Sequence, residues 1–158
     1  MDAQTSYFRA ALDAAAEQVR QNIPVFGKAF PLPCTRNGVY STDINTDWTP
    51  GFYTGMCWLA YEATGEDVFR TAALQQVDSF AERLVLNENL DHHDLGFLYT
   101  PSCVAGYQLT GSTAARNAAL EAAARLMKRY QPIGQFLQAW GQINDRKEYR
   151  LIIDCLLN

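Results

Sequence analysis

The sequence predicts an all-α protein built from pairs of packed helices, and two observations lead to this fold class. The first is an internal repeat, in which the segment 61–65, Tyr-Glu-Ala-Thr-Gly, is matched by 107–111, Tyr-Gln-Leu-Thr-Gly, at an offset of 107 − 61 = 46 residues. The second is that apolar residues recur at helical spacing around each Thr-Gly pair. The 158 residues, 48% apolar and 19% charged, suffice for one globular unit with a sizeable core.

Each Thr-Gly pair predicts the end of a helix, because glycine tolerates the left-handed conformation that follows a last helical turn. Ser112 follows the second pair and suits the N-cap of the next helix. The segments 51–62 and 96–109 carry almost no charge and are expected to be inner helices. The helix after the first pair is expected to lie outside, with a polar face that includes Arg70, Gln75, Gln76 and Glu82 and an apolar stripe made of Phe69, Ala72, Ala73, Val77, Phe80 and Leu84.

Two stretches interrupt this pattern, and the first of them is rich in proline and glycine. The stretch before Asp47 predicts an irregular functional loop, and a second loop over 141–148 precedes an apolar helix expected to begin near Arg150. That helix lacks the usual stop signals. The sequence therefore predicts that residues 1–158 are an incomplete domain, truncated after Asn158.

The charge and the apolar content of the sequence exclude some classes of binding partner. A net charge of −4, from 17 acidic and 13 basic residues, argues against a nucleic-acid partner. The first twenty residues lack a signal peptide and no apolar run is long enough to cross a bilayer, so we expect a cytoplasmic protein without a membrane partner. The four cysteines, which form no Cys-x-x-Cys pair, are expected to be buried free thiols: Cys34, Cys57, Cys103 and Cys155.

The segment 91–94, Asp-His-His-Asp, is the first candidate for chemistry. Adjacent His92 and His93 point in different directions on regular backbone, and the spacing of a zinc site is absent, so we predict no metal and no cofactor here. A helix N-terminus at Asp94 fits better, with one histidine holding Asp94 or a ligand. An N-cap without any catalytic role explains the same residues.

The repeat offset connects Asp94 with two tryptophans, because 94 − 46 = 48 and 94 + 46 = 140 are Trp48 and Trp140. In a ring of helical hairpins, equivalent positions lie on the same rim, so the three side chains are expected to converge on one mouth. Aromatic faces cover the apolar face of a sugar ring and a carboxylate accepts hydrogen bonds from its hydroxyls. Three unrelated loop residues are the alternative.

Asp154 lies within the apolar segment 151–157, Leu-Ile-Ile-Asp-Cys-Leu-Leu. Burial of an unpaired carboxylate is costly, so this residue is expected to have a partner or a function. Burial favours the protonated form of a carboxyl group, which is the form that general-acid catalysis requires. A buried aspartate satisfied by a neighbouring helix is the alternative.

Four segments in order resemble the unsaturated glucuronyl hydrolases, which are family 88 of the glycoside hydrolases. They are Trp48-Thr49-Pro50-Gly51-Phe52-Tyr53-Thr54-Gly55-Met56-Cys57-Trp58-Leu59-Ala60-Tyr61-Glu62, Asp91-His92-His93-Asp94-Leu95-Gly96-Phe97, Gln138-Ala139-Trp140-Gly141 and Ile152-Ile153-Asp154-Cys155-Leu156-Leu157-Asn158. The resemblance implies an (α/α)6 barrel of six helical hairpins, represented here by about its first half.

The resemblance also implies hydrolysis of oligosaccharides that end in a C4=C5 unsaturated uronic acid, by hydration of the vinyl ether. Asp154 matches the family's acid/base and Asp94 its second essential carboxylate. Trp48 and Trp140 match its stacking residues, and His93 matches its site histidine.

Two other interpretations remain open on the sequence alone. One is a truncated, catalytically incompetent remnant that binds the sugar, and the other is a helical scaffold for protein contacts. In either case an incomplete barrel leaves apolar surface uncovered, so we expect self-association.

Overall fold

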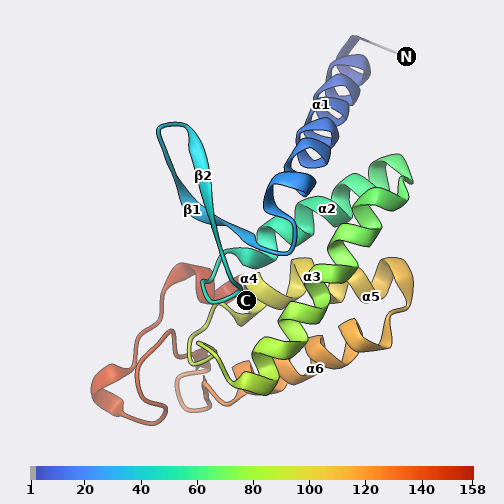
Figure 1. The fold of residues 1–158 in the computed structure, drawn as a ribbon. Coiled ribbons are helices and arrows are strands. Elements are labelled where there is room, and N and C mark those ends of the chain that lie inside the picture. Colours follow the sequence, from blue (N-terminus) through green and yellow to red (C-terminus); the bar gives the residue numbers. More distant parts are fainter. Residues whose placement is uncertain (1–2) are drawn as a thin grey trace.

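The computed structural model describes residues 3–158, which form a mostly helical body with two small β-hairpins (Figure 1). The elements in chain order are α1 Ala3–Phe26, β1 Phe30–Arg36, β2 Val39–Asp43, α2 Pro50–Thr64, α3 Asp67–Leu86, α4 Leu95–Tyr99, the π-helical turn η1 Thr100–Val104, α5 Ala105–Thr110, α6 Thr113–Met127, β3 Tyr130–Gln131, β4 Phe136–Leu137, and the 3-10 helices η2 Arg146–Glu148 and η3 Ile153–Leu156.

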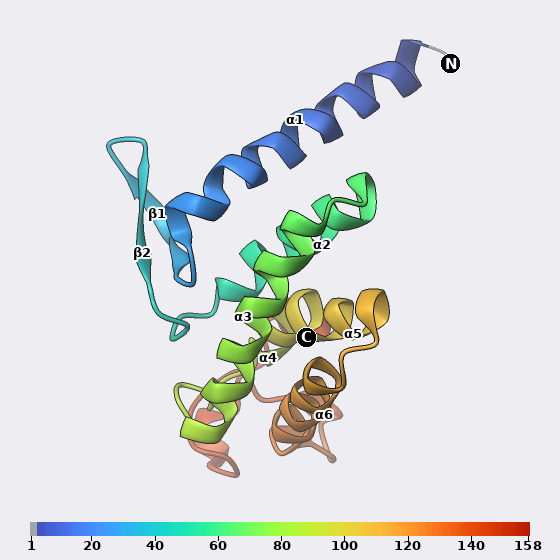
Figure 2. The same ribbon diagram turned by 45° about the vertical axis from the view of Figure 1, so that its right-hand side comes forward.

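Two helical hairpins lie side by side, which confirms the predicted architecture (Figure 2). The first pairs α2 with α3, and the second pairs the continuous helical run α4–η1–α5 with α6. Both hairpins turn as predicted. Gly65 and Gly111 adopt φ of 74° and 71°, and each donates its backbone N–H to the carbonyl four residues earlier. Ser112 Oγ accepts the N–H of Ala115 and caps α6.

The core follows the predicted apolar stripe of α3. Phe69 and Phe80 are fully buried, and the Phe80 ring meets Phe30 and Tyr99 edge-on at centroid distances of 5.7 and 5.5 Å. One assignment was wrong. Gln76 was expected on the polar face but is buried, because its Oε1 accepts the hydroxyl of Thr54 from the neighbouring helix at 2.8 Å.

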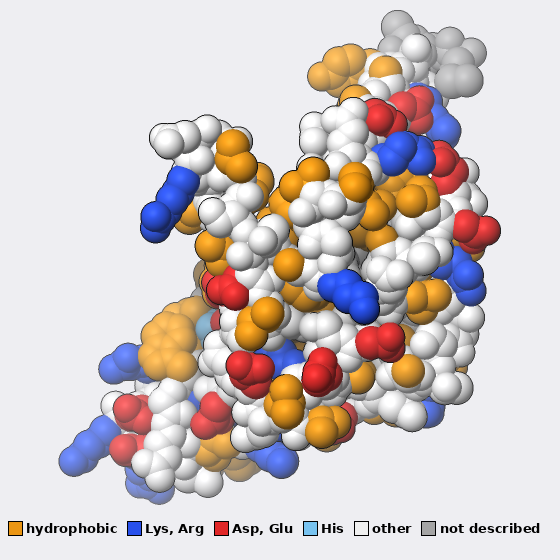
Figure 3. Space-filling model, in the orientation of Figure 1, with side chains coloured by type: hydrophobic (Ala, Val, Ile, Leu, Met, Phe, Trp, Pro, Cys, Tyr) orange, Lys and Arg blue, Asp and Glu red, His pale blue; other side chains and the backbone are white. Residues whose placement is uncertain are grey.

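The stretch before Asp47 is not the irregular loop that the sequence predicted. It forms the antiparallel hairpin β1–β2, which turns at Asn37 and Gly38, both with positive φ. The hairpin and the first half of α1 project from the helical body (Figures 1 and 2), and residues 4–15 of α1 are exposed. Apolar side chains gather where the hairpin and α1 meet the body (Figure 3). Self-association through such surface stays a prediction.

The apolar helix expected from Arg150 onwards is absent. Only the short 3-10 helix η3 forms there, and Leu151, Ile153 and Leu156 are 58%, 84% and 78% exposed. The reason is physical: an apolar helix is stabilised by the surface that covers it, and nothing in residues 3–158 covers these side chains. No helix within that range is long and apolar enough to cross a bilayer.

A buried arginine at the end of α3 organises the loop in front of α2. Arg83 is 2% exposed and donates to the carbonyl oxygens of Thr46 and Asp47 and to Asn45 Oδ1, at 2.7 to 3.2 Å. The same guanidinium donates to the carbonyl oxygens of Glu88 and Asn89 in the loop that follows α3. One side chain therefore joins two loops that are far apart in the sequence.

Arg129, at the equivalent position of the repeat (129 − 83 = 46), does the same for the next loop. It is 1% exposed and donates to the carbonyl and carboxylate of Asp91 at 3.1 and 2.8 Å. It also donates to the carbonyls of Gln138 and Gly141. Asp91 is in turn equivalent to Asn45, since 91 − 45 = 46. We name Arg83 and Arg129 the clamp arginines.

The clamp arginines give a first prediction. Replacing Arg83 with Met removes the arginine donor from four part-buried carbonyls, at about 1 to 3 kcal/mol for each group left unsatisfied. We expect the free energy of unfolding, measured by urea denaturation, to fall by at least about 3 kcal/mol. Arg9 is the control, because its exposed pair with Asp13 contributes less than about 1 kcal/mol. Equal stability of R83M and R9M would contradict the clamp.

The cysteines give a second prediction. Cys57, Cys103 and Cys155 are buried as expected, whereas Cys34 is exposed, contrary to the sequence prediction. Burial raises the pKa of Cys57 and Cys103 to about 12, so only ~1 in 10,000 of these groups is a thiolate at pH 8. Iodoacetamide at pH 8 should rapidly label one site, detected by mass spectrometry. C34S should remove that site, and rapid labelling of Cys57 in the folded protein would contradict the burial.

Candidate active site

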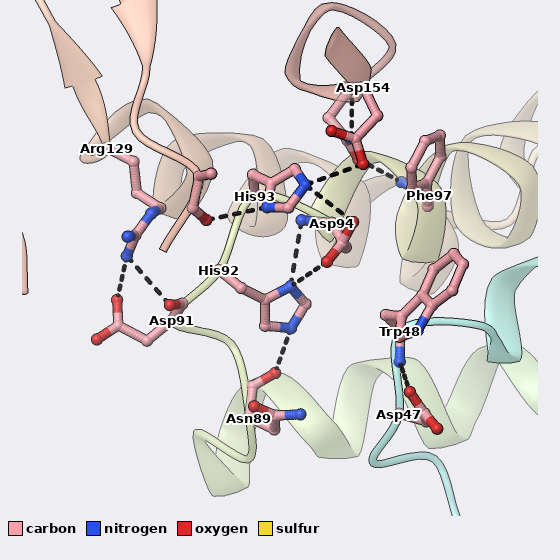
Figure 4. Close-up of polar contacts among 12 residues, drawn as sticks. Asp47, Trp48, Asn89, Asp91, His92, His93, Asp94, Phe97, Arg129 and Asp154 are labelled. Atoms are coloured by element: carbon pink, nitrogen blue, oxygen red, sulfur yellow. Dashed lines mark hydrogen bonds and ion pairs between the residues drawn. The ribbon is translucent and has the colours of Figure 1, made fainter. Parts of the chain in front are cut away.

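The two neighbouring histidines diverge, as predicted (Figure 4). His92 lies 2.8 Å through Nε2 from the carbonyl oxygen of Asn89, and its Nδ1 accepts the backbone N–H of Asp94 at 3.1 Å. A carbonyl accepts only, so Nε2 carries the hydrogen and the ring is the neutral Nε2–H tautomer. Burial lowers the pKa of His92, in agreement with a neutral ring.

His93 is the centre of the candidate site. It is 3% exposed, and both its backbone N–H and its ring Nδ1 lie within 2.9 Å of the carbonyl oxygen of Ala139. Its other ring nitrogen, Nε2, lies 3.1 Å from Oδ2 of Asp154 and 3.3 Å from Oδ1 of Asp94. Two carboxyl groups from segments sixty residues apart (154 − 94 = 60) therefore meet on one imidazole nitrogen.

Asp94 occupies the N-cap position of α4, as predicted, but its side chain makes no capping hydrogen bond. Its carboxylate turns instead toward the two imidazoles, with Oδ2 at 3.2 Å from Nδ1 of His92 and Oδ1 beside Nε2 of His93. The main chain still starts the helix, because the carbonyl oxygen of Asp94 accepts the N–H of Leu98. The carboxylate is thus available for a ligand rather than used by the helix.

Asp154 reaches the cluster from η3, not from the buried helix that the sequence predicted. Its side chain is 31% exposed, yet its Oδ1 atom is enclosed and has no hydrogen-bond partner among residues 3–158. Asn158 fastens this segment to the start of α4, since Nδ2 donates to the carbonyl of Asp154 and Oδ1 accepts the N–H of Phe97. A Cβ on Gly96 would lie 2.5 Å from the Asn158 Cα, so only glycine permits this approach.

The two tryptophans lie at the edge of the cluster. The Trp140 ring is 5.8 Å from the ring of His93, and the guanidinium of Arg150 lies 5.9 Å over the same indole. Trp48 approaches from the loop before α2 and meets Phe97 at 6.3 Å, one turn into α4 (Figure 4). Trp140 and Trp48 are 38% and 44% exposed, so both rings can receive a ligand.

The structure therefore brings four of the five predicted site residues into one connected cluster, with Trp48 joined through Phe97. Sequence reasoning missed Ala139, whose carbonyl orients His93, and Asn158, which holds the Asp154 segment. Backbone acceptors leave no side-chain signature. The clamp arginines were visible in the repeat, but their role was not, because their partners are mostly carbonyls.

Three side chains of the site are of types that can bind a metal ion. His93, Asp154 and Cys155 offer ligand atoms that all lie within 4.8 Å of one another. Asp154 and His93 already contact each other, so the group is explained without an ion. The predicted absence of metal and cofactor stays a prediction.

Comparison with known proteins gives a consistent result, although no family model matches the chain. The unsaturated chondroitin disaccharide hydrolase of Streptococcus pyogenes is 50% identical over 94% of this chain, which spans 37% of that protein. The crystal structure of the unsaturated glucuronyl hydrolase from Streptococcus agalactiae is 47% identical and superimposes with a TM-score of 0.89, over 95% of this chain and 39% of that one.

A variant of an unsaturated glucuronyl hydrolase from S. agalactiae, complexed with dGlcA-GalNAc6S, is 44% identical with a TM-score of 0.72, over 77% of this chain and 33% of that one. The chain thus spans less than half the length of the relatives it matches. These relatives are α/α barrels, and the two helical hairpins described above form part of such a barrel. In both sequence and fold, the chain matches the N-terminal portion of the unsaturated glucuronyl hydrolases.

Proposed function

We propose that this chain carries the catalytic carboxyl groups of a glycoside hydrolase that acts on oligosaccharides with a C4=C5 unsaturated uronic acid at the non-reducing end. One observation carries the proposal: Asp94 and Asp154 meet on His93 beside the exposed ring of Trp140. Paired carboxyl groups next to an aromatic face suit a reaction that develops positive charge on a sugar ring.

Asp154 is the acid and base of the proposed reaction. Its carboxyl proton goes to C4, the C4=C5 π bond breaks, and the positive charge at C5 is shared with the ring oxygen. Water then adds to C5 and returns one proton to Asp154, so the enzyme ends in its starting state. The resulting hemiketal opens and releases the aglycone, and the net reaction consumes one water.

Asp94 is the second carboxylate of the proposed reaction. It accepts hydrogen bonds from the hydroxyls of the sugar and, as an anion near the ring, stabilises the developing positive charge. Its main chain is held by α4, and its side chain lies beside two imidazoles that leave part of it exposed. Trp48 and Trp140 cover the apolar face of the substrate.

The names of the relatives support a chondroitin-type substrate. One relative is an unsaturated chondroitin disaccharide hydrolase and another was solved with dGlcA-GalNAc6S. We therefore propose an unsaturated chondroitin disaccharide as the first substrate to test. A cytoplasmic location stays a prediction.

A second candidate function is sugar binding without turnover. It is favoured by the exposed rings of Trp48 and Trp140, which can stack on a sugar whether or not Asp154 transfers a proton. This candidate retains Trp48, Asp94 and Trp140 as binding groups, but Asp154 has no catalytic role in it.

The catalytic proposal predicts the effect of one substitution. Replacing Asp154 with Asn removes the proton donor, so the rate at which an unsaturated chondroitin disaccharide loses its ultraviolet absorbance should fall by at least about 1,000-fold. Asp145→Asn is the matched control, because Asp145 only caps η2 and asparagine caps equally well. D154N turning over at the control rate would refute the assignment, and a chain that binds the sugar without turnover would leave the second candidate.

The binding groups predict a fluorescence change. Trp58 is buried with its N–H on the carbonyl of Ser102, so a sugar that stacks at the site should change only the emission of Trp48 and Trp140. Titration with the unsaturated disaccharide should saturate, and W140L should weaken binding about tenfold. W58F should leave the affinity unchanged. A flat titration at every concentration would exclude both candidate functions.

A further inference from the structure

The hydrogen bonds of His93 indicate that this residue positions a proton rather than contacting the sugar. We propose that His93 holds one proton on the line between its Nε2 and Oδ2 of Asp154, and is the positioning residue for the proton that Asp154 transfers. The use of that proton rests on the proposed function. The presence of the proton does not, since it follows from the contacts of three side chains.

The first step is the state of Nδ1. Nδ1 of His93 lies 2.9 Å from the carbonyl oxygen of Ala139, and a carbonyl oxygen can only accept. Nδ1 therefore carries a hydrogen whether the ring is neutral or charged. In a neutral ring the opposite nitrogen, Nε2, is then a bare acceptor.

The second step is the conflict that a bare Nε2 creates. Its contacts are Oδ2 of Asp154 at 3.1 Å and Oδ1 of Asp94 at 3.3 Å. Two ionised carboxylates facing a lone pair would place three acceptors together with no hydrogen between them. One additional proton relieves the conflict. On Nε2 it serves both carboxylates, and on Oδ2 of Asp154 it is donated to Nε2, which leaves only the longer contact with Asp94 without a hydrogen.

The enclosed oxygen of Asp154 supports the same proton. Oδ1 has no partner in residues 3–158 and is shielded from water, although the side chain as a whole is 31% exposed. An ionised carboxylate would place part of its charge on this unpartnered atom, which is costly. A proton shared through Oδ2 lowers the charge on the group and so lowers this cost.

The surrounding charged groups do not supply the missing hydrogen. His92 contacts Asp94 but not Asp154, and its Nε2 hydrogen is already donated to Asn89. The Arg150 guanidinium lies over the Trp140 ring and, within residues 3–158, makes no hydrogen bond to His93, Asp94 or Asp154. The Cys155 thiol belongs to the same group of atoms but is a weak donor.

A held proton has a direct consequence for the reaction. Hydration needs Asp154 to begin as an acid, and the pair supplies one proton, which passes from Oδ2 to C4. The cluster then carries one more negative charge, opposite the positive charge on the sugar. The water that adds to C5 returns the proton to Asp154, and the Nε2–Oδ2 pair is restored.

The test counts protons without requiring turnover, so its failure is distinct from failure of the proposed function. The 158-residue chain has two histidines, and H92Q leaves His93 as the only source of imidazole signals. Long-range ¹H–¹⁵N correlation at pH 7 reports the state of each ring nitrogen, and ¹³C carboxyl shifts report Asp94 and Asp154. We expect a protonated Nδ1 and one further proton, on Nε2 or on the Asp154 carboxyl group.

A second variant identifies the partner of that proton. In D154N the side-chain amide can donate to Nε2, so the ring should become neutral with Nδ1 protonated and Nε2 bare. The Asp145 side chain caps η2, so D145N should leave the protonation of the His93 ring as it is in the wild type. The proposal is overturned by a bare Nδ1, or by a bare Nε2 facing two ionised carboxylates in the protein with native Asp154.

Discussion

The candidate site depends on the way two buried guanidinium groups satisfy loop backbone. The loops before α2 and α4 have no regular structure, so their carbonyl oxygens need donors from elsewhere. Arg83 provides them from the last turn of α3 and Arg129 from just beyond the end of α6. Each joins the loop in front of an inner helix to the loop behind an outer one. A planar group with five donors suits this task better than lysine.

These contacts lead directly to the site. Arg83 donates to the carbonyl of Asp47, the residue before Trp48. It also donates to the carbonyl of Asn89, which accepts the Nε2 hydrogen of His92. Arg129 holds Asp91, the first residue of the segment 91–94 that contains both histidines. The rigidity of the rim is therefore a property of the repeat, because the same interaction recurs once per 46 residues. The residues proposed for catalysis and stacking differ between repeats, whereas the arginine that holds the loop beneath them does not.

The sequence predicted most of the helical frame because its signals are local. The glycine ends at Gly65 and Gly111 and the cap at Ser112 need only neighbouring residues to act. The helix expected near Arg150 failed for the opposite reason. Its apolar pattern indicates a helix only if another surface covers it, and periodicity carries no information about that surface. Gln76 was misplaced in the same way, since its partner Thr54 comes from another helix.

The site was predictable as a set of residues but not as a hydrogen-bond network. The repeat offset indicated Asp94 and the two tryptophans, the apolar segment 151–157 indicated Asp154, and family resemblance selected His93. Neither indicated that His93 would lie between the two carboxyl groups, because its orientation depends on the carbonyl of Ala139.

Gly96 sets a geometric limit on the distance between the two carboxyl groups. The segment that carries Asp154 lies against the first turn of α4 with no room for a methyl group between the two backbones. Any side chain at this position would push the segment that carries Asp154 away from Asp94, although it would remove no polar group of the site. The spacing of the two carboxyl groups therefore depends on a position where only a hydrogen atom fits.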